Sequence, residues 1–246
     1  SEWKPDLVIW IDAGPEFQIT NPQDFGCATA CLIGDLHTGQ SNWRIDYARQ
    51  FQHTFVMFNR DHVAQLKASG CNAGWLPAAC EPEIHRTFDL PKAYDVVFVG
   101  QTMPAWHKDR VRLLERLKEG GFDLRVDSKI LEEMALLFSR GRLVFNRSLN
   151  NDLNMRVFEA MACGSLLITD RLPNAAGLEE LFEDRRHLVL YDEEDLEALV
   201  AYYLKNEDER EEIAERGRTE VLAHHTYGHR ADQLLAQVFG ARAVAS

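Results

Sequence analysis

Arg147, Arg156 and Glu159 lie close together in the sequence, on either side of a segment rich in asparagine. Asparagine and aspartate favour turns and helix caps, and the apolar residues that follow recur at helical spacing as far as Gly164. This pattern predicts a loop and then a helix that Gly164 ends. The unpaired amides at a helix N-terminus attract an anion, and an arginine adds a cation. Anion binding is therefore the first chemistry that this stretch indicates.

The elements around this stretch must place it at the edge of a sheet. Apolar runs at residues 142–145 and 166–169 enclose it, so the predicted order is strand, loop, helix, strand. In a parallel α/β sheet, such a unit points the helix N-terminus at the crevice beyond the strand ends, where open sheets bind ligands. Further candidate residues follow predicted strands in the same way, namely Asn146, Arg147, Gly100, Gln101 and, slightly farther along, Arg110.

Each candidate also has a purely structural explanation. Arg156 and Glu159 are three residues apart on one predicted helix and could form an intrahelical ion pair, worth about 0.2–0.5 kcal/mol. Asn146 could cap the helix, and Gly100 could serve only a tight turn. Arg110 could be a solvated residue in the first turn of its helix.

Strands and helices alternate along the chain. The first half has strand patterns at residues 6–11, 27–34 and 53–58 and helix patterns at 41–50 and 60–68. Residues 78–94 contain prolines and scattered charges without periodicity, which predicts a connection. The alternation then restarts and closes with amphipathic helices. We therefore expect an α/β protein with a short N-terminal Rossmann-like domain at residues 1–80 and a second one at residues 94–225.

The composition excludes several classes of protein. The 246 residues carry a formal net charge of −12, which would repel a phosphate backbone, so we expect no nucleic-acid partner. No apolar run approaches the roughly 18 residues that span a bilayer, and the first residues lack the form of a secretory signal, so we expect a cytoplasmic protein without a transmembrane segment. The nine histidines show no metal-ligand spacing with acids or cysteines, so we expect no metal.

The chain resembles the GT-B glycosyltransferases, in particular the CgeB-like group with a "glycosyl transferases group 1" C-terminal domain. The resemblance extends over most of the chain beyond about Thr54, and the string from Phe158 to Gly164 is its most specific part. The other segments that carry it are residues 55–58, 74–79, 95–100, 154–157, 192–204 and 225–230.

This resemblance implies two Rossmann-like domains facing a cleft, with a nucleotide-sugar donor held mainly by the C-terminal domain. The amides of residues 151–155, including Asn154 and Met155, would bind the diphosphate together with Arg147 and Arg156. Glu159 would accept hydrogen bonds from the ribose hydroxyls, each worth about 1.5–3 kcal/mol. We expect a UDP-sugar or GDP-sugar donor, no other cofactor and an acceptor that the sequence does not identify. The final helix, within residues 226–246, would pack back toward the N-terminal domain.

Asp35 and His37 follow the second predicted strand and would face the acceptor. Transfer with inversion needs a general base for the acceptor hydroxyl, and either residue could serve, at a gain of roughly 10²–10⁴ in rate. Alternatively, the two side chains bond each other or cap the following helix.

Two features depart from the family pattern. Related retaining enzymes have two glutamates that bracket the loop before Glu159, and the upstream position here is Asn151. The N-terminal domain is also short, so the chain is either a minimal enzyme or a fragment. The rival functions are a nucleotide-sugar epimerase or phosphorylase-like enzyme of the same fold, and a catalytically silent sugar-nucleotide-binding or coat-assembly protein.

Overall fold

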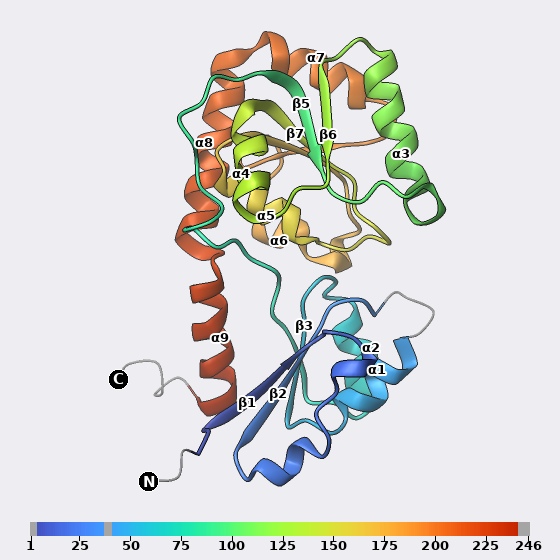
Figure 1. Ribbon diagram of the computed structural model, residues 1–246, viewed down its shortest axis with the longest axis vertical. Coiled ribbons are helices and arrows are strands. Elements are labelled where there is room, and N and C mark those ends of the chain that lie inside the picture. Colours follow the sequence, from blue (N-terminus) through green and yellow to red (C-terminus); the bar gives the residue numbers. More distant parts are fainter. Residues whose placement is uncertain (1–3, 37–40, 241–246) are drawn as a thin grey trace. The chain divides into compact units, whose positions relative to one another are not determined.

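A computed structural model describes residues 4–36 and 41–240 of the protein. The chain divides into two compact units (Figure 1). Unit 1 comprises residues 1–78 and 228–246, and unit 2 comprises residues 79–227. Each unit contains one parallel sheet, which confirms the predicted α/β class with two sheets.

Unit 1 has a four-stranded parallel sheet in the order β1-β2-β3-β4. Its strands are β1 (Leu7–Ile11), β2 (Ala28–Ile33), β3 (His53–Val56) and β4 (Ala73–Trp75), and its first helices are α1 (Ser41–Ala48) and α2 (His62–Ala68). Two short 3₁₀ helices that we did not predict, Pro15–Phe17 and Pro22–Phe25, connect β1 to β2. One face of the sheet packs against α1 and α2 around Trp10, Tyr47 and Leu66.

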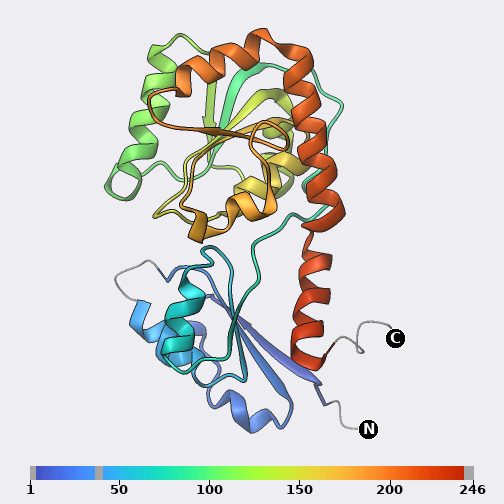
Figure 2. The same ribbon diagram turned by 180° about the vertical axis from the view of Figure 1, so that it is seen from behind.

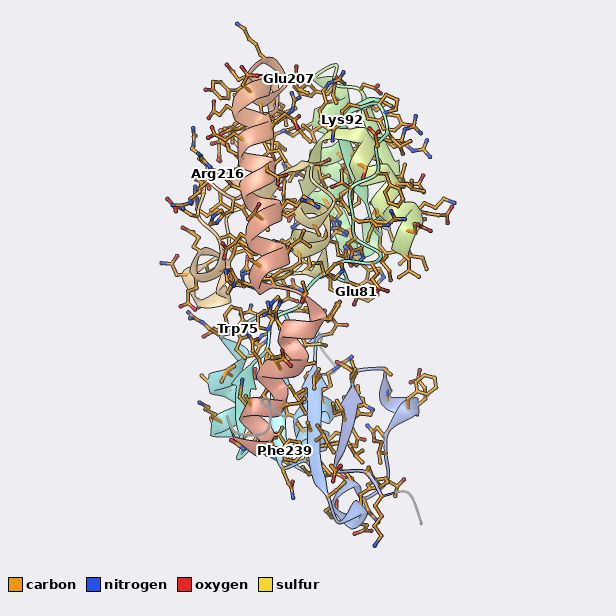
Figure 3. All side chains as sticks on the ribbon, turned by 90° about the vertical axis from the view of Figure 1, so that its left-hand side faces the viewer. Trp75, Glu81, Lys92, Glu207, Arg216 and Phe239 are labelled. Carbon is orange, nitrogen blue, oxygen red and sulfur yellow. The ribbon has the colours of Figure 1, made fainter. Side chains whose placement is uncertain are left out.

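The last helix, α9 (Tyr227–Phe239), covers the other face of this sheet. Its Leu234 packs against Ala30, Phe55 and Leu76, so an apolar side of the helix is buried. Arg230 on the same helix donates hydrogen bonds to the carbonyl oxygens of Pro77 (2.8 Å) and Ala78 (3.3 Å) just beyond β4. Figure 3 labels Phe239 at the end of α9. These contacts explain why α9 belongs to unit 1, although the helix is far in sequence from the other elements of that unit.

Unit 2 has a five-stranded parallel sheet in the order β6-β5-β7-β8-β9. The strands are β5 (Tyr94–Val99), β6 (Leu124–Asp127), β7 (Gly141–Asn146), β8 (Leu166–Asp170) and β9 (Val189–Tyr191). The helices are α3 (Pro104–Glu119), α4 (Leu131–Arg140), α5 (Met155–Ala162), α6 (Leu178–Leu181), α7 (Leu196–Lys205) and α8 (Glu207–His224), with a 3₁₀ helix at Asn174–Ala176.

Helices cover both faces of this sheet (Figures 1 and 2). On one face, α3 and α7 pack apolar side chains such as Leu113 and Leu199 against Phe98 and Phe145. On the other face, α4 packs against β5 and β7, and α5 packs against β7 and β8. A parallel strand that is buried on both faces needs an almost continuous apolar sequence, as the run Val96–Val97–Phe98–Val99 has.

The strand order of unit 2 reverses direction between β5 and β7. The chain runs from β5 outward to β6 and then returns to β7 on the other side of β5. The register pairs Val97 with Val144, and continuing it past the strand ends places Gly100 level with Arg147. Open α/β sheets bind ligands where the order reverses, at the carboxyl ends of the strands. The fold therefore predicts a binding crevice at the ends of β5 and β7.

The sequence pattern predicts helices that start at about His107 and at Glu193, and the structure starts both elsewhere. Helix α3 begins at Pro104, because proline is favourable in the first helical position, and its backbone is non-helical at His107. Helix α7 begins at Leu196. The acidic residues before it form a turn in which the amide of Asp192 donates to Asp195 Oδ1 (2.9 Å).

Candidate functional site

Arg156 links the ends of the two strands that flank the order reversal. Its Nε donates to the carbonyl oxygen of Val99 at the end of β5 (2.7 Å), and its Nη1 donates to Asn146 Oδ1 at the end of β7 (2.6 Å). The guanidinium lies over the Phe98 ring, 4.6 Å from its centroid. Nη2 has no hydrogen-bond acceptor among the described residues and is the group of Arg156 available to a ligand.

Gly100 makes room for this arrangement. Its φ of +154° is unfavourable for other residues, and a Cβ at this position would collide with Nη2 of Arg156 and lie 3.1 Å from Cζ of Phe98. Arg156 cannot simply move aside, because two hydrogen bonds fix its guanidinium. Burial and the neighbouring Arg110 lower the pKa of Arg156 to about 9, so the side chain stays charged at neutral pH.

Arg110 holds the loops beyond β5 and β7 together. It is buried, and its Nη1 and Nη2 donate to the carbonyl oxygens of Gln101 (2.8 Å) and Arg147 (2.9 Å). Both terminal nitrogens are thus used by the protein backbone. The geometry favours a positioning role for Arg110, and the backbone of Gln101 is part of the scaffold that it holds.

Arg147 lies among acidic side chains. Its guanidinium is 3.3 Å from Asp170, 3.6 Å from Glu193 and 3.9 Å from Asp109. Asp170 is buried and also accepts hydrogen bonds from the amide and the hydroxyl of Ser148. These carboxylates offset the charge of Arg147, so Arg156 is the better cation for an anionic ligand at the strand ends. Asp170 follows a predicted strand, as the other candidates do, but it was not among the residues expected at the site.

The N-terminus of α5 is attached to the end of β7. Asn154, the residue before the helix, donates from Nδ2 to Asn146 Oδ1 (3.2 Å), and Asn146 donates to Thr169 Oγ1 (2.9 Å). Asn150 and Asn151 in the preceding loop have φ of 52° and 62°, a left-handed conformation that asparagine tolerates well. Met155, the first residue of the helix, is 43% exposed. The first amides of α5 are therefore held beside the strand ends.

Glu159 lies one turn beyond Arg156 on α5, with 14% of its side chain exposed. Arg156 turns toward Val99 and Asn146, and no ion pair joins it to Glu159 in the described structure. The nearest basic side chain is instead His85, whose Nε2 lies 3.7 Å from Glu159 Oε1. Burial raises the pKa of Glu159 to about 7, partly offset by the charge of Arg156. The sequence pattern did not predict His85 at this site, because the residue lies in a stretch without periodicity.

The two residues expected to act on the acceptor belong to unit 1. Asp35 follows β2 and is exposed, and His37 lies outside the described residues. The other acid at these strand ends, Asp12, pairs with Nε of Arg44 (2.6 Å) and accepts a hydrogen bond from the amide of Gly34 (3.3 Å). In the described ranges, no three residues of His, Cys, Asp or Glu come together as a metal site, and no helix is long and apolar enough to cross a membrane.

Residues 84–236 match the model of a protein family described as glycosyl transferase-like. The chain belongs to this family. The match includes every candidate residue of unit 2 and His85, so the site described above lies within the family domain. A comparison with curated protein sequences gives no match.

Solved structures of glycosyltransferases share the fold at low sequence identity. Sucrose-phosphate synthase from Thermosynechococcus elongatus is 14% identical with a TM-score of 0.61, over 91% of this chain and 70% of that chain. Anabaena Alr3699/HepE in complex with UDP-glucose is 13% identical with a TM-score of 0.66, over 87% and 72% of the two chains. A glycosyltransferase from Rickettsia africae is 10% identical with a TM-score of 0.67, over 95% and 76%.

Proposed function

We propose that the protein binds a nucleotide-diphosphate sugar through unit 2 and transfers the sugar to an acceptor hydroxyl. The observation that carries the proposal is the position of Arg156, whose Nη2 is available where the strand order reverses. Family membership supports sugar transfer as the reaction. UDP is the favoured nucleotide, because structures of the similar HepE contain UDP-glucose or UDP, and that of the pneumococcal O-GlcNAc transferase GtfA contains UDP and GlcNAc.

In this proposal, Arg156 and the amides of Asn154 and Met155 bind the diphosphate. The cation and the helix dipole offset the negative charge that develops on the leaving nucleotide. Glu159 accepts hydrogen bonds from the ribose hydroxyls. Arg110 and Asn146 fix these groups in place, and Gly100 allows Arg156 to approach the strand end.

The finer assignments belong to the same proposal. Asp35 or His37 would take the proton of the acceptor hydroxyl. A cytoplasmic location and membership of the CgeB-like group, both expected from the sequence, also remain proposals.

A donor panel tests the enzymatic part of the proposal. UDP-sugars and GDP-sugars incubated with the protein should release nucleoside diphosphate slowly by hydrolysis, and addition of the correct acceptor should accelerate the release. UDP at about 100 times its dissociation constant should stabilise the protein by roughly 2.7 kcal/mol and raise its melting temperature. Stabilisation by UDP without release from any donor would favour a silent binding protein. If UDP did not stabilise the protein and no donor released nucleoside diphosphate, the proposal would be contradicted.

A further inference from the structure

His85 lies in the segment between Ala79 and β5, whose course Figure 3 marks with the labels of Glu81 and Lys92. The side chain is buried, and its Nδ1 accepts a hydrogen bond from the backbone amide of Glu81 (2.9 Å). An acceptor nitrogen carries no proton, so the proton of the neutral ring must be on Nε2. The backbone of Glu81 thus selects the tautomer of His85.

The nitrogen that carries the proton in this tautomer, Nε2, is also the ring nitrogen that lies near Glu159. The distance from Nε2 to Glu159 Oε1 is 3.7 Å, slightly longer than a hydrogen bond, and a small side-chain shift would close it. We infer that His85 is a positioning residue, whose Nε2–H orients the Glu159 carboxylate to accept hydrogen bonds from the donor ribose. The inference rests on the proposed function, since it assigns a ribose contact to Glu159.

Burial and the hydrogen bond from the Glu81 amide favour the neutral form of His85. A proton on Nδ1 would face the amide proton of Glu81 and break that hydrogen bond. Burial also lowers the pKa of His85, although the Glu81 carboxylate opposes this effect. The charged group that acts on Glu159 from its own helix is Arg156. His85 therefore offers a directed, uncharged donor, and Arg156 remains the cation of the site.

Two substitutions at position 85 separate this role from a purely structural one. The amide of Gln occupies the place of Nε2 and can donate to Glu159, whereas Asn occupies the place of Nδ1 and can accept from Glu81 but cannot reach Glu159. His85→Asn should weaken UDP binding about tenfold in calorimetric titration, because a carboxylate loses a donor that orients it. His85→Gln should retain most of the affinity. If Gln lost as much affinity as Asn, or Asn lost none, the inference would be overturned.

A measurement without nucleotide separates this inference from the proposed function. A hydrogen bond to a carboxylate favours its charged form, so His85→Asn should raise the pKa of Glu159 by about 1, measured by carbon NMR of the side-chain carboxyl. His85→Gln should leave that pKa near the wild-type value. An unchanged pKa in the Asn variant would contradict the contact, even if the wild-type protein bound UDP. A raised pKa in a protein that binds no UDP would retain the contact and remove the proposed function.

Discussion

Gly100→Ala should weaken UDP binding by roughly 10-fold to 150-fold. The new Cβ would collide with Nη2 of Arg156, and the guanidinium can move only by breaking its hydrogen bonds to Val99 and Asn146. A displaced Nη2 would lose its charged hydrogen bond to the diphosphate, worth about 1.5–3 kcal/mol. The φ of +154° adds strain for alanine, so the free energy of unfolding should also fall by about 1–3 kcal/mol.

Gly121→Ala is the matched control for this substitution. Gly121 also has a positive φ, +84°, in the same unit, but a Cβ there would meet no atom within 4 Å. The control should lose stability through backbone strain and bind UDP with wild-type affinity. Calorimetric titration and chemical denaturation of both variants compare the two effects. Equal UDP affinity in the wild-type protein and Gly100→Ala would show that Arg156 does not contact the nucleotide.

Glu159→Gln should weaken UDP binding by about 1.5–3 kcal/mol and remove part of its pH dependence. Glutamine keeps the shape of the side chain but loses the charge that makes the carboxylate a strong acceptor for ribose hydroxyls. The pKa of Glu159 is raised to about 7, so in the wild-type protein the ionised acceptor forms as the pH rises through neutrality. UDP affinity should therefore increase between about pH 6 and 8 in the wild-type protein more than in the variant.

Glu159→Gln also controls for titration of the ligand, because both proteins bind the same phosphate groups, which titrate near pH 6. Parallel pH profiles in calorimetry would mean that only the ligand titrates, and equal affinities at pH 8 would remove Glu159 from the site.

The same pKa predicts how stability changes without ligand. The folded protein binds the Glu159 proton more tightly than the unfolded chain, whose glutamate titrates near 4.5. The free energy of unfolding should thus fall as the pH rises from about 4.5 to about 7, by at most about 3 kcal/mol from this residue, and level off above that. The free energy of unfolding of the Glu159→Gln variant should lack this decrease. Identical stability profiles for the two proteins in urea denaturation would show that the carboxyl is not buried as described.

The order of strands and helices follows from sequence patterns that act locally. Buried parallel strands need apolar runs such as that of β5, and Gly164 ends α5 in a left-handed conformation with φ of 74°. The short 3₁₀ helices between β1 and β2 were missed because they have too few residues to show a period. Strand order was not predicted either, since it depends on which runs pair across the sheet.

The candidate site was predictable as a region but not as a set of roles. Strand ends located Gly100, Asn146 and Arg147, because polar residues directly after apolar runs can be read from the sequence. Arg147 and Arg156 were both expected to bind the diphosphate, whereas the structure surrounds Arg147 with carboxylates and leaves Nη2 of Arg156 available. The partners of a long side chain depend on tertiary contacts, and the distant His85 beside Glu159 is another example.

A crystal structure of the protein with UDP tests the central claim most directly, namely that a nucleoside diphosphate binds where the strand order of unit 2 reverses. We predict a diphosphate oxygen within hydrogen-bond distance of Nη2 of Arg156 and of the first amides of α5, with the ribose hydroxyls at Glu159. UDP bound elsewhere on the protein, with Arg156 and Glu159 in contact with no part of it, would contradict the claim.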